Sequence, residues 1–196
     1  MAKDFTICVG TVGAGVWYSS NGGDNWRRSK MKLPFDAEPG EIQIRALAVS
    51  PHNPDHIYAG SEVGLYRSQD KGASWNLIDS PMEGKQIWSL AVHPDDPNEI
   101  WAGTKPPAVY RTKDGGKNWQ QVAIEPAKEC LAGAPKVTNV MIDPRDHNTV
   151  WVGVEIDGRA EHLGVLHHDL DLAVLRRGGP DRGAIAQGRA EDDALL

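Results

Sequence analysis

The eight residues Ser68-Gln69-Asp70-Lys71-Gly72-Ala73-Ser74-Trp75 decide the fold, because their pattern stands at two other places in the chain. It returns as Ser19-Ser20-Asn21-Gly22-Gly23-Asp24-Asn25-Trp26 and as Thr112-Lys113-Asp114-Gly115-Gly116-Lys117-Asn118-Trp119. In each copy a hydroxyl residue stands seven before the tryptophan, Asp or Asn five before, Gly three before, and Ser or Asn one before. The hydroxyl and the carboxylate can accept hydrogen bonds from loop N–H groups, glycine can take a positive φ, and the indole can bury a large apolar face. The pattern therefore predicts three self-contained turns.

Short β-rich runs surround each of these turns. First runs, each ended by a proline, cover residues 44–51, 87–94 and 137–144. Second runs cover residues 7–10, 57–60, 100–103 and 150–153, and each closes on a glycine that we expect to start a turn. Third runs cover residues 16–18, 65–67 and 109–111, and a fourth run starts at each tryptophan of the pattern. Four strands per unit joined by tight turns predict a propeller blade.

The spacing of the units supports this architecture. Successive tryptophans of the pattern, Trp26, Trp75 and Trp119, are 49 and 44 residues apart. A four-stranded blade takes roughly 40–45 residues, whereas a β-sandwich does not repeat its sequence at a fixed period. We therefore predict an all-β fold, a β-propeller of four-stranded blades.

The repeated turn resembles the Asp-box, or BNR, repeat, whose pattern is S-x-D-x-G-x-T-W. The resemblance covers residues 5–158 and implies a propeller of the type found in sialidases, sortilin-like receptors, xyloglucan-degrading hydrolases and photosystem II assembly factors. It also implies that the box is structural and lies on the face opposite the usual ligand site. The box residues are then Ser19, Asn21, Gly23, Trp26, Ser68, Asp70, Gly72, Trp75, Thr112, Asp114, Gly116 and Trp119.

The repeat stops between Gly158 and Arg159. Earlier units place the box hydroxyl eight or nine residues after the second-run glycine, and this count from Gly153 reaches His162 without a box. Composition changes at the same place: all seven Trp, four Tyr, two Phe and ten Lys lie at or before Trp151, and residues 159–196 contain no Ser, Thr or Asn. We interpret residues 1–158 as a propeller fragment and residues 159–196 as a non-propeller tail, disordered or derived from a frameshift. A genuine C-terminal extension and a diverged blade are the alternatives.

The propeller is expected to be incomplete, with about three and a half blades, because the first unit starts at its second strand. An open stack of blades exposes unpaired edges, so self-association through those edges is a further expectation.

Composition limits the classes of partner. The formal net charge is −6, and no run of Lys and Arg suggests nucleic-acid binding. No window approaches the roughly 20 apolar residues of a membrane helix, and the N-terminal residues lack the pattern of a signal peptide, so we expect no membrane partner and a cytoplasmic location. The two cysteines, Cys8 and Cys130, lack C-x-x-C spacing, and we predict no disulfide framework, metal site or cofactor.

Candidate binding residues come from propeller convention, which places loops after second strands and before first strands at the mouth of the central channel. Arg45, Trp88 and Asn139 stand at the starts of first strands, and Glu62, Lys105 and Glu155 follow second strands. Glu62 and Glu155 are candidates for the paired carboxylates of a glycosidase, or else are solvated charges on the rim. Trp88 is either core or a platform for a sugar.

A sialidase activity finds little support. That family implies an arginine cluster and a Tyr–Glu pair, whereas all four tyrosines occupy repeat positions, as do Arg67 and Arg111. The favoured function is a non-catalytic scaffold or binding module for a carbohydrate or protein ligand. The alternative is a fragment of a glycoside hydrolase, sialidase-like or xyloglucanase-like, and a third is a chain without function because the ring cannot close.

Overall fold

The computed structural model describes residues 5–33, 42–124, 135–156, 159–167 and 172–176, with the last two ranges described by their backbone only. Every regular element within these ranges is a β-strand. No helix in the described ranges is long and apolar enough to cross a membrane. The prediction of an all-β chain is therefore confirmed.

The strands form four sheets in chain order. The first sheet holds β1 (Ile7–Gly10), β2 (Val16–Ser19) and β3 (Arg27–Arg28). The second holds β5 (Ile44–Val49), β6 (Ile57–Ser61), β7 (Leu65–Ser68) and β8 (Ser74–Ile78), to which β4 (Lys30–Met31) adds in parallel on the outside. The third holds β9 (Gln86–Val92), β10 (Ile100–Lys105), β11 (Val109–Thr112) and β12 (Gln120–Val122). The fourth holds β13 (Lys136–Ile142), β14 (Thr149–Ile156), β15 (Arg159–His167) and β16 (Leu172–Arg176).

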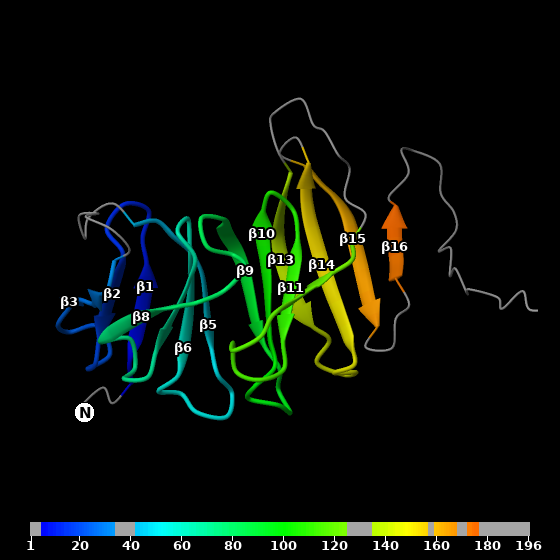
Figure 1. Ribbon diagram of the computed structural model, residues 1–196. Coiled ribbons are helices and arrows are strands. Elements are labelled where there is room, and N and C mark those ends of the chain that lie inside the picture. The colour runs from blue at the N-terminus through cyan, green and yellow to red at the C-terminus, as the bar shows by residue number, and fades with distance from the viewer. Residues whose placement is uncertain (1–4, 34–41, 125–134, 157–158, 168–171, 177–196) are drawn as a thin grey trace, which may run out of the picture.

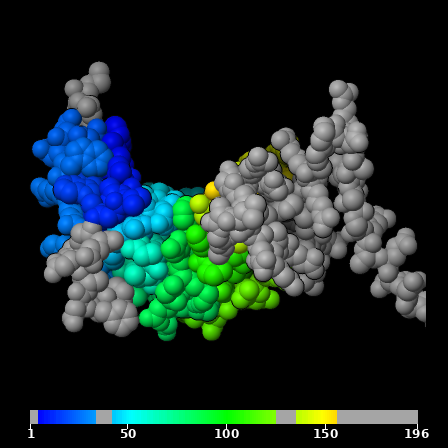
Figure 2. Space-filling model, turned by 90° about the horizontal axis from the view of Figure 1, so that it is seen from above, coloured from blue at the N-terminus to red at the C-terminus, as the bar shows by residue number. Residues whose placement is uncertain are grey.

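These sheets are antiparallel blades that stand side by side (Figure 1). The first strands of blades two, three and four, β5, β9 and β13, contact one another in sequence and form the inner layer. Seen from above, the described residues follow a curved row with a hollowed side (Figure 2). Blade one has three strands in the described residues and begins at the second strand of the repeat, as expected.

One close approach fixes the spacing of successive blades. The fourth residue of β1, of β6 and of β10 is a glycine that lies against the first branched residue of the next inner strand. The pairs are Gly10 with Ile44, Gly60 with Ile87 and Gly103 with Val137. Cβ atoms at these three positions would stand only 2.5, 2.6 and 2.3 Å from the branched side chains. None of the three glycines has a positive φ. Gly10 ends β1 as expected, but β6 and β10 continue past Gly60 and Gly103, so the expectation that the glycine closes the second strand and starts a turn is wrong in blades two and three. The three glycines are extended residues that give room to the neighbouring blade.

Apolar side chains fill the spaces between blades. Three clusters of buried residues lie along the row, and Trp75, Tyr66 and Leu65 are among the largest side chains that they enclose. Each cluster combines strands of consecutive blades, as in the group of Val16, Ile44 and Trp75. Burial between sheets therefore stabilises the stack, since a single blade has no core of its own.

The region after Gly158 differs from the sequence-based expectation in its backbone. We expect no blade strands there, but β15 pairs with β14 over residues 159–167 and β16 pairs with β15. The remaining residues of the 159–196 segment lie outside the described ranges. The interpretation of this segment as disordered or frameshift-derived stays a prediction.

Candidate functional site

The three Asp-boxes are closed hydrogen-bonded turns between the last two strands of their blades. In the second box, Ser68 Oγ donates to Asp70 Oδ1 at 2.8 Å and accepts the N–H of Gly72 at 2.8 Å. Asp70 Oδ1 also accepts the N–H of Ser74 at 2.8 Å. Equivalent bonds join Ser19, Asn21 and Gly23 in the first box and Thr112, Asp114 and Gly116 in the third. The box glycines have φ values of +96°, +88° and +92°, as this turn requires.

The box tryptophans differ in burial because their neighbours differ. Trp75 is 1% exposed and donates its indole N–H to the carbonyl of Gly72 at 3.0 Å. Trp119 is half-buried and makes the same bond to Gly116 at 3.1 Å. Trp26 is 42% exposed, since no sheet precedes blade one in the described residues. The indole therefore packs between sheets in boxes two and three only.

A second repeated turn, which the sequence reasoning missed, lies at the same end of the blades. It joins the first and second strands of a blade. In each copy a backbone N–H at the start of the second strand donates to the carbonyl three residues earlier. The three bonds run from His56 to Asn53, from Glu99 to Asp96 and from Thr149 to Asp146. The side chains of Asn53, Asp96 and Asp146 also accept the N–H two residues on. Each of the three stands two residues after the proline of its unit. This repeated spacing was the signal in the sequence from which the turn could have been predicted.

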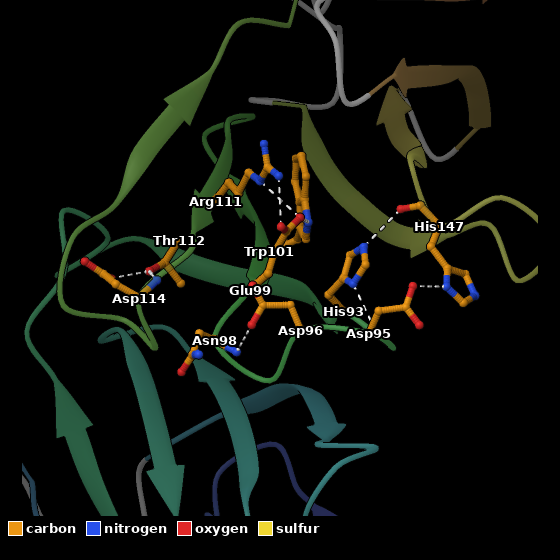
Figure 3. Close-up of polar contacts among 10 residues, drawn as sticks. All are labelled: His93, Asp95, Asp96, Asn98, Glu99, Trp101, Arg111, Thr112, Asp114 and His147. Atoms are coloured by element: carbon orange, nitrogen blue, oxygen red, sulfur yellow. Dashed lines mark hydrogen bonds and ion pairs between the residues drawn. The ribbon is translucent and has the colours of Figure 1, made fainter.

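The box end also holds a buried ion pair in blade three (Figure 3). Arg111 donates to both oxygens of Glu99, at 3.0 and 2.9 Å, and its guanidinium lies 4.9 Å from the centre of the Trp101 ring. Glu99 and Arg111 are 4% and 13% exposed at their side chains. Trp101 completes the group by donating its indole N–H to Glu99 at 2.8 Å. These contacts give Arg111 a role within the blade, in agreement with its repeat position.

The opposite end of the blades holds the candidate binding residues. Each inner strand carries a β-bulge at the residue after its first branched residue, where the pairing with the second strand shifts register. The extra residues are Arg45, Trp88 and Thr138. A bulge re-aims a side chain and often lies beside a binding site. The true equivalent of Arg45 and Trp88 in blade four is thus Thr138, which the sequence reasoning missed, whereas Asn139 is its exposed neighbour.

Trp88 lies among cations from both neighbouring blades. The guanidinium of Arg45, from blade two, is 4.3 Å from the centre of the Trp88 ring, and the ammonium of Lys136, from blade four, is 4.1 Å from it. The indole N–H donates to the side chain of Gln86 at 3.1 Å. Because two cations already contact its ring, Trp88 is better placed to hold these cations through cation–π contacts than to stack on a sugar. Lys136 has no repeat signal in the sequence and is recognised only from this contact.

Each of the candidate carboxylates has a partner of its own. Glu62 accepts the backbone N–H of Gln43 with both oxygens, at 3.0 and 2.8 Å. Glu155 forms an ion pair with Lys136 at 3.0 Å, and both side chains are partly buried. Lys105 ends β10 opposite Gln86 and is half-buried. Glu155 therefore lies beside the cations around Trp88, because its partner Lys136 contacts that ring. Glu62 is connected to them through Gln43, whose side chain accepts a hydrogen bond from Arg45.

The cation of Arg45 is only partly satisfied. Its terminal nitrogen bonds to Gln43, but Nε is buried without a hydrogen-bond partner among the described residues. A buried donor without a partner costs free energy. The group formed by Gln43, Arg45, Trp88, Lys136 and Glu155 is called the mouth cluster below.

The tyrosine beside Glu62 is not an activated nucleophile. The Tyr66 side chain is buried, and its hydroxyl has no partner in the described part of the chain. Burial, together with the nearby charge of Glu62, raises the pKa of Tyr66 to about 12. An activated phenol needs a lowered pKa, so the Tyr66–Glu62 pair has the wrong electrostatics for attack on a sugar.

Comparisons with known proteins agree with this fold. A probable oligoxyloglucan-reducing end-specific xyloglucanase of Neosartorya fischeri is 29% identical over 115 residues, which are 55% of this chain and 14% of that enzyme. Among solved structures, an ancestral GH74 enzyme matches with a TM-score of 0.68 at 24% identity, over 90% of this chain and 23% of that one. YCF48 bound to D1 peptide matches with a TM-score of 0.62 at 18% identity, over 91% of this chain and 52% of that one. This chain thus spans less than a quarter of the two enzymes and about half of YCF48.

A family model described as "Sortilin-Vps10: Sortilin, neurotensin receptor 3" matches residues 63–165. The matched segment is just over half of the chain and contains the second and third Asp-boxes. The chain therefore belongs to the Sortilin-Vps10 family, within the BNR/Asp-box class of β-propellers, and represents part of the length of its relatives.

Proposed function

We propose that this chain is a non-catalytic binding module whose mouth cluster binds a protein segment that carries carboxylates. One observation carries the proposal: Arg45 and Lys136 converge on the ring of Trp88 from two different blades. Three blades contribute to this one group, so only the folded stack presents it. A site assembled in this way, at the end opposite the boxes, is suited to recognition.

The charge of the mouth cluster favours an anionic ligand. The chain as a whole has a formal net charge of −6, yet Arg45, Lys105 and Lys136 gather at this end of blades two to four. Glu155 already pairs with Lys136, and a ligand carboxylate can exchange with it at small cost because both side chains are partly exposed. The guanidinium of Arg45, which donates to Gln43 through one terminal nitrogen, has further N–H groups of the kind that bond to carboxylates.

A protein ligand also agrees with a relative. YCF48 has been solved bound to D1 peptide, and its propeller resembles this chain in fold. The mouth cluster offers a mixture of amide, aromatic and cationic groups, which is typical of peptide-binding surfaces. The cytoplasmic location stays a prediction from composition.

The second candidate function, a glycoside hydrolase, rests on the likeness to the xyloglucanase. A glycosidase needs one carboxylic acid with a raised pKa and a second carboxylate that faces it. Here Glu155 is paired with Lys136 and Glu62 accepts the backbone N–H of Gln43, so each carboxylate is engaged by its own partner within the chain. This arrangement favours binding over acid catalysis.

The test compares binding and turnover in the full chain. A dye-labelled, capped pentapeptide with three glutamates is titrated against the protein, and its counterpart with three glutamines is the ligand control. We expect the glutamate peptide alone to bind, and Arg45→Gln or Lys136→Gln to weaken it about tenfold through loss of a charge-assisted bond. Lys113→Gln, at the box end, is the matched variant that leaves binding unchanged.

Turnover is measured as release of reducing ends from xyloglucan oligosaccharides. The proposal expects no release above buffer. Release that disappears in Glu155→Gln, together with equal binding of both pentapeptides, would overturn the proposal and establish the hydrolase.

A further inference from the structure

Three equivalent pairs of residues lie at the mouth of the stack, one in each of blades two to four. Each pair joins the residue before the first branched residue of the inner strand to a residue near the end of the second strand. The pairs are Gln43 with Glu62, Gln86 with Lys105 and Lys136 with Glu155. The first pair is anionic and the second is cationic, whereas the ion pair in blade four is neutral overall. The charge of the mouth therefore differs from blade to blade, although the backbone repeats.

The amide side chains of Gln43 and Gln86 have the same role in their blades. Each accepts a hydrogen bond from the side chain two residues further on. The donors are a terminal nitrogen of Arg45 in blade two and, at 3.1 Å, the indole N–H of Trp88 in blade three. Because the guanidinium of Arg45 also lies against the Trp88 ring, it is fixed by contacts from two blades. One cation of the mouth is thus held in position before a ligand arrives.

Blade four departs from this pattern because its residue is a lysine. A lysine side chain cannot accept the bond that the two glutamines accept. The Lys136 ammonium instead lies 4.1 Å from the centre of the Trp88 ring and 3.0 Å from Oε2 of Glu155. The side chains of Lys136 and Glu155 are 22% and 29% exposed, so solvent reaches both. Glu155 therefore occupies, from within the chain, a position in which a ligand carboxylate would contact Lys136.

The distance between the two cations limits the shape of the ligand. The guanidinium of Arg45 lies 4.3 Å and the ammonium of Lys136 lies 4.1 Å from the centre of the same ring, so the two charges are separated by no more than the sum of these distances. In an extended chain, side chains two residues apart lie on one face, separated by about 6.6–6.8 Å, whereas adjacent side chains point to opposite faces. Two acidic residues at this spacing match the two cations.

We propose that the mouth cluster selects an extended segment with two acidic side chains two residues apart, one bound by Arg45 and the other by Lys136 in exchange for Glu155. This inference rests on the proposed function and specifies its ligand. Glu155 acts as an internal competitor for Lys136. A ligand already bound at Arg45 presents its second carboxylate at a high local concentration and displaces Glu155, whereas a ligand with one carboxylate has no such advantage. Glu155 is accordingly the residue that sets the preference for paired acidic groups.

The test uses two dye-labelled, capped heptapeptides of the same composition, each with two glutamates among alanines and serines. The glutamates stand at positions 3 and 5 in one peptide and at positions 1 and 7 in the other. Fluorescence anisotropy measures both affinities for the full chain. We expect the 3,5 peptide to bind about fivefold more tightly, because its carboxylates reach both cations at once.

Two variants assign this preference to residues. Lys136→Gln should bring the ratio of the two affinities to about one, and Glu155→Gln should raise it about threefold, since Lys136 then has no competitor. Lys113→Gln, at the box end, is the matched control and should keep the wild-type ratio. Each ratio is taken within one variant, so a partial loss of folded protein leaves it unchanged.

Four outcomes would overturn the inference. Equal affinities of the two peptides for the wild type, with both weakened by Arg45→Gln, would remove the spacing rule and leave the proposed function in place. A ratio that Glu155→Gln leaves unchanged or lowers would remove the role of Glu155. If neither heptapeptide binds, the inference fails, and the three-glutamate pentapeptide decides whether the proposed function fails with it. Tighter binding of the 3,5 peptide by the double variant Asp36→Asn, Glu38→Gln would show that an acidic pair of the chain itself occupies the cations.

Discussion

Gly60 in β6 lies directly against Ile87 in β9, and a Cβ at position 60 would stand 2.6 Å from Cγ2 of Ile87. The contact crosses from blade two to blade three, and it repeats between Gly10 and Ile44 and between Gly103 and Val137. The glycine of the second strand and the branched residue of the next inner strand are therefore a matched pair. Their close approach brings each bulge residue, the next in sequence, to the mouth of the stack.

Gly60→Ala should destabilise the protein by about 1–3 kcal/mol, because the added methyl group overpacks a rigid interblade contact. The measurement is urea unfolding followed by far-UV circular dichroism. Gly153→Ala is the matched control, since its Cβ would meet Asn139 and Thr138 of its own sheet at no less than 3.3 Å. An equal loss for both variants would contradict the interblade role of Gly60.

Glu99→Gln should cost about 3–5 kcal/mol, because it leaves the guanidinium of Arg111 buried without its carboxylate. Urea unfolding measures this loss. The exposed pair of Lys71 and Asp55, at 3.5 Å, provides the comparison: Asp55→Asn should change stability by no more than about 1 kcal/mol. Similar losses of stability in Glu99→Gln and Asp55→Asn would mean that burial does not strengthen the Glu99–Arg111 pair.

Tyr66→Phe should raise the stability by about 1 kcal/mol, because it removes a buried hydroxyl that has no partner. Thermal unfolding monitored by calorimetry measures the effect. Tyr110→Phe changes the same repeat position in blade three, where no buried unsatisfied hydroxyl occurs, and should be close to neutral. Destabilisation by Tyr66→Phe would show that the hydroxyl has a partner in solution.

The third Asp-box should make stability depend on acid pH. Hydrogen bonds from the backbone and side chain of Asn118, and from Thr112, lower the pKa of Asp114 to about 2. An unfolded aspartate has a pKa of about 3.9, so the ionised form stabilises the fold above pH of about 4, and this contribution is lost as the pH falls towards 2. Asp114→Asn removes the titrating group.

The measurement is the urea midpoint of the wild type and Asp114→Asn between pH 5 and pH 2. The difference in urea midpoint between the wild type and Asp114→Asn should shrink as the pH falls. Box one has Asn21 at this position, and Asn21→Asp should add an acid-dependent term of the same sign. A difference that stays constant with pH would contradict the role of the Asp114 carboxylate.

The strand order could be predicted from the sequence because two strong local signals coincide. The box pattern fixes the turn between the last two strands, and the proline of each unit marks the end of the first strand, whereas the second strands β6 and β10 run on past their glycines. The prediction placed the fourth strand at each tryptophan, and β3, β8 and β12 begin within one residue of Trp26, Trp75 and Trp119. Local turn chemistry determines these boundaries.

Long-range contacts account for what the sequence reasoning missed. The extended φ of Gly60 follows from packing against Ile87, which stands 27 residues further along the chain and belongs to another blade. Lys136 reaches Trp88 across the same kind of interface. Thr138 is the second residue of its first run, as Arg45 and Trp88 are of theirs, so the alignment of the runs was the available signal for it, whereas the bulge itself depends on strand register.

The most direct test of the binding proposal is the indole N–H spectrum of the tryptophans during titration with the three-glutamate pentapeptide. Trp88→Phe assigns the Trp88 signal. We expect a saturable shift of that signal alone, while the signals of Trp75 and Trp119 at the box end stay in place. A shift at the box tryptophans, or no shift at Trp88 up to millimolar peptide, would contradict the assignment of the mouth cluster as the ligand site.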